Sequence, residues 1–144
     1  ADGLLTTLSE QTLAIIKEHV TDILLVSEEE IIAVFDITQL IRVITNLVKN
    51  AIQAIPEEKV DKKVEVSVYR KGDEVKIEVK DNGKGISEDN QSRIFEPKFT
   101  TKTSGMGLGL AIIKNIIENY NGTITFESRL EKGTTFYVSF PITE

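Results

Sequence analysis

The sequence lacks cysteine, has no long apolar run and carries more negative than positive charge. Without Cys among its 144 residues, the chain has neither a disulfide framework nor a thiolate metal site. No apolar run approaches the roughly 18 residues that a membrane-spanning helix needs, and the first residues show no signal-peptide pattern. A net charge of −6 argues against general binding to nucleic acids or anionic membranes.

The remaining composition is that of an ordinary globular protein, with 40% hydrophobic and 28% charged residues. No repeat, low-complexity tract or linker divides the chain, so we expect a single domain over residues 1–144 with one core. Because the chain starts at Ala1 rather than at Met, we expect it to be an excised piece of something longer.

Hydrophobic periodicity predicts helices over residues 6–18, 37–55 and 107–120, the second ended by Pro56 and the third by Asn121-Gly122. Alternating patterns predict antiparallel hairpins over 63–80 and 123–140, and short apolar runs predict strands over 21–26 and 31–35. Strands that come in hairpins, with helices grouped against them, favour an α+β fold in two layers, an α/β sandwich, over a Rossmann fold.

A polar stripe marks the helix predicted over 37–55. Asn46 and Asn50 lie one turn apart on one helix face, with Arg42 and Gln53 nearby and away from the apolar side. Asn is a poor residue for a helix interior. The stripe is either a solvated face or a set of oxygen donors for Mg²⁺ that is held mainly by phosphates.

A second motif, "KDNGKGI" at 80–86, directly follows a predicted strand. It is either a simple turn or a binding loop. A turn needs one glycine, whereas Gly83 and Gly85 alternate here and would let a flat ligand approach the backbone. Asp81, at the strand end, would then offer its carboxylate to an N–H donor.

A third motif, "FEPKFTTKTSGMGLGL" at 95–110, ends in Gly105, Gly107 and Gly109, where the last predicted helix opens. The free N–H groups of a helix start suit phosphate oxygens, and Lys98 and Lys102 add positive charge. Together the three motifs describe a pocket for a nucleotide with Mg²⁺, although the sequence of a P-loop is absent.

The segments "NLVKNA", "DNGKGI", "FEPKFTT" and "GMGLGL" resemble, in order and spacing, the N, G1, F and G2 boxes of the ATP-binding catalytic domain of sensor histidine kinases. These domains share the Bergerat fold with gyrase, chaperone and mismatch-repair ATPases, and the resemblance covers about residues 36–140. It implies a mixed, mostly antiparallel five-stranded sheet packed against three helices. It also implies a mobile ATP lid at about 87–106, anchored by Phe95 and Phe99.

The resemblance implies a role for each polar position. Asn50 would coordinate Mg²⁺, Asn46 would help to bind the phosphates or the metal, and Lys102 would contact the γ-phosphate; these three are the expected catalytic residues. Asp81 would accept a hydrogen bond from the exocyclic amine of adenine. The other implied ATP contacts are Gly83, Gly85, Ile86, Phe95, Thr100, Thr101, Gly105, Met106, Gly107, Leu108, Gly109, Leu110 and Thr135.

The implied function is transfer of the ATP γ-phosphate to a histidine in two-component signalling. The hydrolytic members of the superfamily usually place a Glu four residues before the Mg²⁺ Asn, and Asn46 cannot act as such a base, which favours transfer over hydrolysis. Two further departures are Lys98, where many histidine kinases carry an aromatic residue, and Gln53, which replaces a basic residue. The single histidine, His19, is expected to be a surface residue near a helix end.

The phosphoacceptor would therefore lie on a separate dimerisation domain that is absent from this chain, with a response regulator as the indirect partner and no nucleic acid. We expect the isolated domain to be monomeric and cytoplasmic, within a parent protein that is either membrane-anchored or soluble. Two alternatives stay open. One is an ATPase or serine kinase of the same superfamily, and the other is a non-catalytic ATP-binding module that regulates a partner.

Overall fold

The computed structural model describes residues 22–26, 37–96 and 109–141. Along the chain these form β1 (Asp22–Val26), α3 (Ile37–Ala54), β2 (Lys63–Lys71), β3 (Glu74–Asp81), α4 (Glu88–Gln91), α5 (Gly109–Asn119), β4 (Thr123–Arg129) and β5 (Gly133–Pro141). The helix predicted over 6–18 and the strand predicted over 31–35 lie outside the described residues. The other predicted helices and strands are present near their expected bounds.

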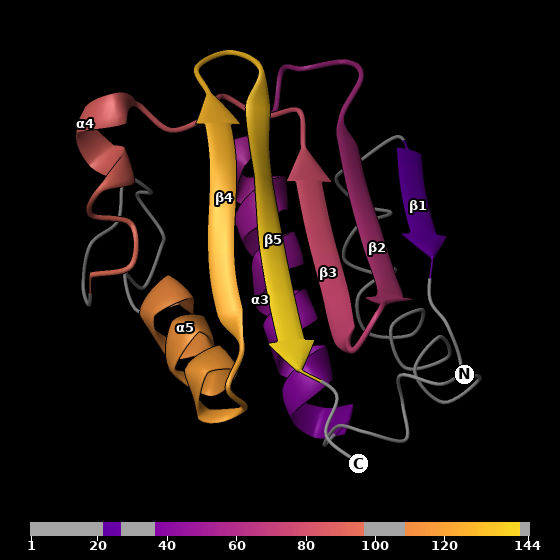
Figure 1. The fold of residues 1–144 in the computed structure, drawn as a ribbon. Coiled ribbons are helices and arrows are strands. Elements are labelled where there is room, and N and C mark those ends of the chain that lie inside the picture. Colours follow the sequence, from indigo (N-terminus) through magenta and orange to yellow (C-terminus); the bar gives the residue numbers. More distant parts are fainter. Residues whose placement is uncertain (1–21, 27–36, 97–108, 142–144) are drawn as a thin grey trace.

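The strands form one sheet in the order β1-β2-β3-β5-β4 (Figure 1). Strands β2, β3, β5 and β4 pair antiparallel, which confirms both predicted hairpins, and β1 adds a parallel strand beside β2. The hairpin turns depend on backbone angles that suit glycine, because Gly72 has φ of 62° and Gly133 has φ of 119°. The sheet is therefore mixed and mostly antiparallel.

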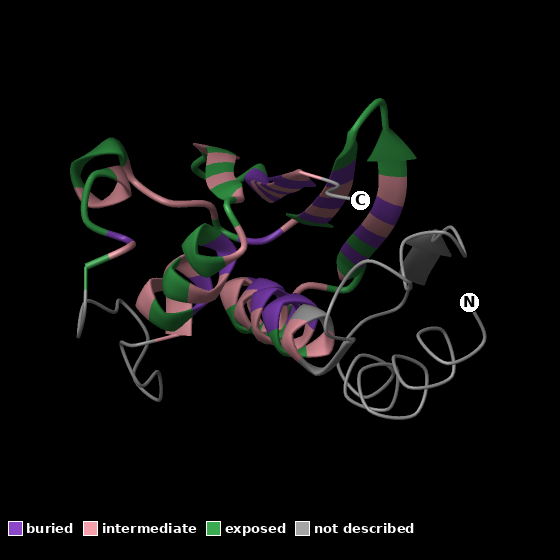
Figure 2. Ribbon diagram, turned by 60° about the horizontal axis from the view of Figure 1, so that its bottom comes forward, coloured by how far each residue is buried: buried purple, intermediate pink, exposed green. Residues whose placement is uncertain are grey.

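The two long helices, α3 and α5, lie on the same side of the sheet (Figure 2). From α3, Val43, Ile44 and Leu47 are fully buried, and Ile113 and Ile117 are fully buried on α5. They pack against alternate strand residues, so that one face of the sheet, which we call the inner face, is apolar. The α+β class and the packing of helices on an antiparallel sheet, both predicted from the sequence, are confirmed.

The start of the β4–β5 hairpin is fixed by the end of α5. The Gly122 N–H donates to Ile117 O over 2.9 Å, and the Asn121 N–H donates to Glu118 O over 3.0 Å. With Asn121 in the left-handed region at φ of 61°, these bonds form a Schellman cap. The predicted helix stop at Asn121-Gly122 is confirmed.

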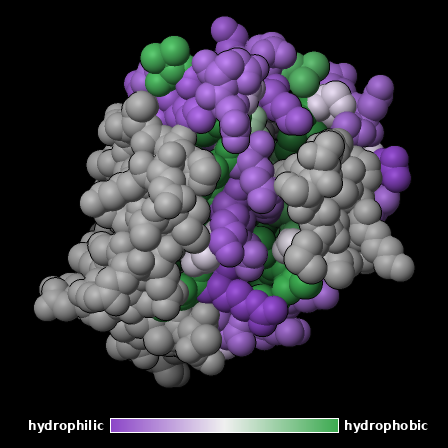
Figure 3. Space-filling view, turned by 180° about the vertical axis from the view of Figure 1, so that it is seen from behind, coloured by the Kyte–Doolittle hydropathy of each residue, from purple (hydrophilic) through white to green (hydrophobic). Residues whose placement is uncertain are grey.

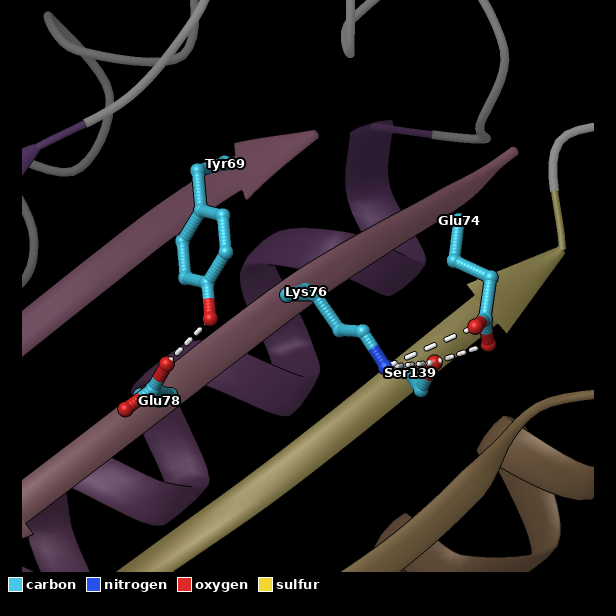
Figure 4. Close-up of polar contacts among 5 residues, drawn as sticks. All are labelled: Tyr69, Glu74, Lys76, Glu78 and Ser139. Atoms are coloured by element: carbon cyan, nitrogen blue, oxygen red, sulfur yellow. Dashed lines mark hydrogen bonds and ion pairs between the residues drawn. The ribbon is translucent and has the colours of Figure 1, made fainter. Parts of the chain in front are cut away.

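The opposite, outer face of the sheet is polar (Figure 4). Tyr69 on β2 donates to Glu78 on β3, and Lys76 Nζ lies 3.1 Å from Ser139 Oγ on β5. The Ser139 hydroxyl donates to Glu74, and this bond lowers the pKa of Glu74, with the charge of Lys76 acting in the same direction. Among the described residues, no helix is both long and apolar enough to cross a membrane.

Candidate functional site

Three polar side chains end the otherwise apolar inner face of the sheet. Asp81 on β3 pairs with Thr134 on β5, and Thr134 pairs in turn with Ser128 on β4. The next inner-face positions along these strands are hydrophobic, namely Val79, Phe136 and Phe126. Asp81 and Thr134 are buried and Ser128 is half-buried. We call Asp81, Thr134 and Ser128 the polar row.

Asp81 is held by backbone N–H groups. Its side chain is only 5% exposed, and Oδ1 accepts hydrogen bonds from the Gly83 N–H over 2.8 Å and from the Thr134 N–H over 3.3 Å. The first bond is an Asx turn, which orders the chain just after β3. A carboxylate held in this way offers only acceptor atoms, so its natural ligand partner is an N–H or O–H donor.

The loop that follows, residues 82–86, packs closely against its own chain. The Lys84 N–H donates to Ala54 O at the end of α3 over 2.9 Å, and a Cβ on Gly83 would lie 2.4 Å from that same oxygen. On the other side, a Cβ on Gly85 would lie 2.1 Å from Arg129 O, and Gly85 has φ of 77°. Gly85 has the positive φ expected of a glycine here, and the Cβ position of each glycine faces backbone atoms of the protein itself.

Asn82 ties the same loop to the entrance of β2. Its Oδ1 accepts from the Lys63 N–H over 2.9 Å, and its Nδ2 donates to Asp61 O over 2.6 Å. Contacts with α3, with β2 and with the β4–β5 hairpin therefore hold the loop from three sides. The backbone next to Asp81 is pre-organised before any ligand arrives.

Ser128 and Thr134 were missed by the sequence analysis. The Ser128 Oγ accepts from the Ile86 N–H over 2.8 Å and lies 2.7 Å from Thr134 Oγ1. Each residue places a hydroxyl at an inner-face position where the strand pattern otherwise has an apolar side chain. The two positions lie at the same end of the neighbouring strands β4 and β5. That signal becomes visible only when the registers of both hairpins are combined.

Thr135 lies on the outer face, away from Asp81. It pairs with Lys80, and the alternation along β5 turns it to the side of Tyr137, with which it interacts. The structure therefore places Thr135, for which the resemblance implied a nucleotide contact, on the opposite face of the sheet from Asp81, whereas its neighbour Thr134 lies on the same face as Asp81.

The polar stripe on α3 lies beside this loop. Asn46 and Asn50 are half-buried, whereas Arg42 and Gln53 are exposed. Asn50 precedes Ala54 by one helical turn, about 6 Å along the axis, and Ala54 O contacts the loop. Since α3 passes behind the sheet in Figure 1, Figure 3 shows the helix side, where a hydrophilic band runs between apolar patches.

The donor set of this stripe fits a hard cation that brings its own anionic ligands. Asn46 donates through Nδ2 to Arg42 O over 2.9 Å, so its side-chain oxygen is the atom that can meet a cation. The described residues contain no cluster of three or more His, Cys, Asp or Glu side chains that could hold a metal alone. Amide oxygens at the margin of a phosphate site are the ligands expected for Mg²⁺ that keeps water and phosphate oxygens.

Phe95 lies between β4 and α5. Its ring meets Phe126 edge-on with centroids 6.0 Å apart, and Lys114 Nζ of α5 lies 5.3 Å from its centroid. Ile94 beside it is buried. Within the first part of the predicted lid, residues 87–96, Ile94 and Phe95 therefore pack against the rest of the domain, whereas α4 has no buried residue.

The rest of the predicted site lies mostly outside the described residues. Gly109 and Leu110 are the first residues of α5, and a Cβ on Gly109 would meet nothing within 4 Å. The predictions for Lys98, Phe99, Thr100, Thr101, Lys102, Gly105, Met106, Gly107 and Leu108 fall on residues that the structure does not describe.

Comparison with known proteins gives consistent matches. The family model "Histidine kinase-, DNA gyrase B-, and HSP90-like ATPase" matches residues 35–144. Sporulation kinase B of Bacillus subtilis (strain 168) is 36% identical over 115 residues, which cover 80% of this chain and 26% of that protein. Sensor histidine kinase ZraS of Escherichia coli (strain K12) is 46% identical over 107 residues, which cover 74% of this chain and 22% of that protein.

Among solved structures, a nucleotide-free form of the catalytic domain of histidine kinase ThkA matches with a TM-score of 0.80 and 32% identity. The match covers 99% of this chain and 92% of that one. The chain thus spans nearly all of a solved catalytic domain but no more than 26% of the two curated relatives.

Proposed function

Because this chain belongs to the family of histidine kinase-, DNA gyrase B- and HSP90-like ATPases, we propose that it binds ATP with Mg²⁺ and donates the γ-phosphate to a histidine on a separate dimerisation domain. It would act as the catalytic domain of a two-component sensor kinase, and the phosphoryl group would pass on to a response regulator. The cytoplasmic location and the monomeric state expected from the sequence stay predictions.

The observation that carries the proposal is the buried Asp81 carboxylate beside loop 82–86. Its Oδ1 is held by the Gly83 and Thr134 N–H groups, so the carboxylate has one preferred orientation before a base arrives. Adenine presents an exocyclic amine as a donor, whereas guanine presents a carbonyl acceptor at the same ring position. An acceptor-only group at this place favours adenine.

The phosphates would lie toward α3. Asn46 and Asn50 would direct their side-chain oxygens at the cation, and Mg²⁺, when bound, would neutralise charge on the triphosphate. Lys102, Gly105 and Gly107 remain proposed phosphate contacts on the strength of their motif positions. The chain's own contribution is to position the triphosphate and to exclude water.

In the transfer, the bond between the γ-phosphorus and the β–γ bridging oxygen breaks, and ADP leaves with the electron pair. A new bond forms from the γ-phosphorus to a ring nitrogen of the acceptor histidine. Hydrolysis would instead need a base to take a proton from water, and Asn46 carries an amide that cannot do so. This difference favours transfer over steady ATP turnover.

The test mixes the 144-residue chain with γ-labelled ATP, Mg²⁺ and the dimerisation–acceptor domain of the same parent protein. We expect label on the acceptor histidine, and no label when that histidine is replaced by Gln. Asn50→Ala should weaken ATP binding much more in the presence of Mg²⁺ than in its absence. ATP binding without any labelling would indicate a regulatory module instead, and steady hydrolysis without an acceptor would indicate an ATPase.

A further inference from the structure

The Ser128 hydroxyl contacts three different parts of the proposed base site. Its Oγ accepts from the Ile86 N–H over 2.8 Å, donates to Gly133 O over 3.3 Å, and lies 2.7 Å from Thr134 Oγ1. Ile86 belongs to the loop beside Asp81, and Thr134 lies next to Asp81 in the polar row. One half-buried hydroxyl therefore joins the loop, the start of β5 and the side chain that neighbours the carboxylate.

The protons of this cluster can be assigned by counting. A serine hydroxyl has one proton and two lone pairs. The Ser128 proton goes to Gly133 O, and the Ile86 N–H occupies one lone pair of Ser128. Either oxygen could donate in the short contact between Ser128 and Thr134. We assign the proton to the Thr134 hydroxyl, because this arrangement alone supplies a proton to every contact of Ser128.

This assignment sets what the pocket offers to a ligand. With its proton directed to Ser128, Thr134 presents only lone pairs, and Asp81 beside it is also an acceptor. Two neighbouring acceptors match an exocyclic amine, which carries two N–H donors, and they oppose a carbonyl oxygen. Without Ser128, the Thr134 hydroxyl would be able to rotate and to donate a hydrogen bond to such a carbonyl.

We propose that Ser128 is a positioning residue for base recognition, which orients the Thr134 hydroxyl so that the pocket favours adenine over guanine. The same contact holds Ile86 and hence loop 82–86 in place. The inference rests on the proposed function, because it specifies how the ATP site of that proposal chooses its base.

The test compares the affinities for ATP and GTP by titration calorimetry in the unchanged chain, Ser128→Ala, Ser128→Thr and Ser139→Ala. Ser139 is a matched control, because it is a strand serine on the outer face. We expect the unchanged chain to prefer ATP, and Ser128→Ala to lower the ATP-over-GTP preference about ten-fold, in keeping with the loss of a hydrogen bond within a buried cluster. Ser128→Thr, which keeps the hydroxyl, and Ser139→Ala should retain the preference.

The ratio of the ATP and GTP affinities separates this role from a merely structural one, because a general loss of stability would weaken the binding of both nucleotides alike. An unchanged affinity ratio in Ser128→Ala overturns the inference. An equal loss of the ATP-over-GTP preference in Ser128→Ala and Ser128→Thr overturns it as well. If Ser128→Ala shows no cooperative thermal unfolding, Ser128→Cys is used in its place. We expect the same drop in the ATP-over-GTP preference, and an unchanged preference would again overturn the inference.

The two proposals fail in different ways. If the unchanged chain binds neither ATP nor GTP, the proposed function falls and the role of Ser128 falls with it. If it binds both nucleotides equally, the adenine preference assigned to Asp81 and the role of Ser128 are both overturned, while nucleotide binding itself stands. If it prefers ATP but Ser128→Ala does so just as strongly, only the role of Ser128 is overturned.

Discussion

One carboxylate oxygen of Asp81 accepts both backbone hydrogen bonds that hold the side chain. The charge of Asp81 can therefore be removed by a substitution that keeps the shape of the side chain. In Asp81→Asn, the remaining side-chain oxygen can still accept from the Gly83 and Thr134 N–H groups, so we expect the fold to survive. The new NH₂ group would face the amine of adenine, donor against donor. We predict that ATP affinity falls by roughly 100-fold, because a charged hydrogen bond is lost.

Titration calorimetry with ATP and thermal unfolding of the same samples check this prediction. Asp73→Asn is the matched control, because Asp73 lies exposed in the β2–β3 turn and should leave affinity unchanged. Unchanged ATP affinity in a folded Asp81→Asn variant would show that the adenine base does not bind at Asp81.

At the scale of elements, loop 82–86 is placed by the backbones of its neighbours. Gly85 and Gly72 both have positive φ, but a Cβ would lie 2.1 Å from Arg129 O at Gly85 and would meet nothing within 4 Å at Gly72. Gly72→Ala should cost about 1 to 2 kcal/mol, the strain of the backbone angle alone. Gly85→Ala should cost roughly 2 kcal/mol more, because the loop must move away from β4.

Urea unfolding of both variants measures the difference in the free energy of unfolding. We also expect Gly85→Ala, but not Gly72→Ala, to weaken ATP binding, since only the former displaces the loop beside Asp81. Equal unfolding costs in the two variants would mean that the contact with Arg129 does not constrain the loop.

The sequence was most informative about elements whose hydrophobic pattern is local. The apolar face of α3 and the alternation in both hairpins are set by residues two to four positions apart, and these elements were predicted correctly. The family was likewise predicted from four motifs in order, and the match to its model over residues 35–144 confirms it.

The site could be predicted only in part, because its remaining features depend on contacts between distant segments. Ser128 and Thr134 come next to Asp81 only because three strands pair in this register. Gly83 and Gly85 leave room for the carbonyl groups of α3 and β4, which are distant in the sequence. The resemblance assigned a nucleotide contact to Thr135, which the structure places on the outer face of β5, beside the buried Thr134. In a strand, one residue is enough to reverse the face.

At the scale of the whole molecule, the sheet separates two chemistries. Its inner face carries the core and ends in the polar row, whereas its outer face carries hydrogen bonds between strands (Figure 4). On that outer face, Tyr69 donates to Glu78, and Tyr137 forms a hydrogen bond with Glu127. The two pairs span β2, β3, β5 and β4, so they connect strands that the helices hold only from the other side.

These pairs predict how stability depends on pH. The hydrogen bond to Glu78 raises the pKa of Tyr69 above its ordinary value of 10.0, and the bond to Glu127 raises that of Tyr137 in the same way. Because the folded chain holds these protons more tightly than the unfolded chain, their contribution is complete below about pH 10 and is lost as pH rises through the raised values. Urea unfolding between pH 8 and pH 11.5 should therefore show a steeper fall in unfolding free energy for the unchanged chain than for the double variant Tyr69→Phe/Tyr137→Phe. Parallel curves for the two proteins would show that neither pair stabilises the outer face.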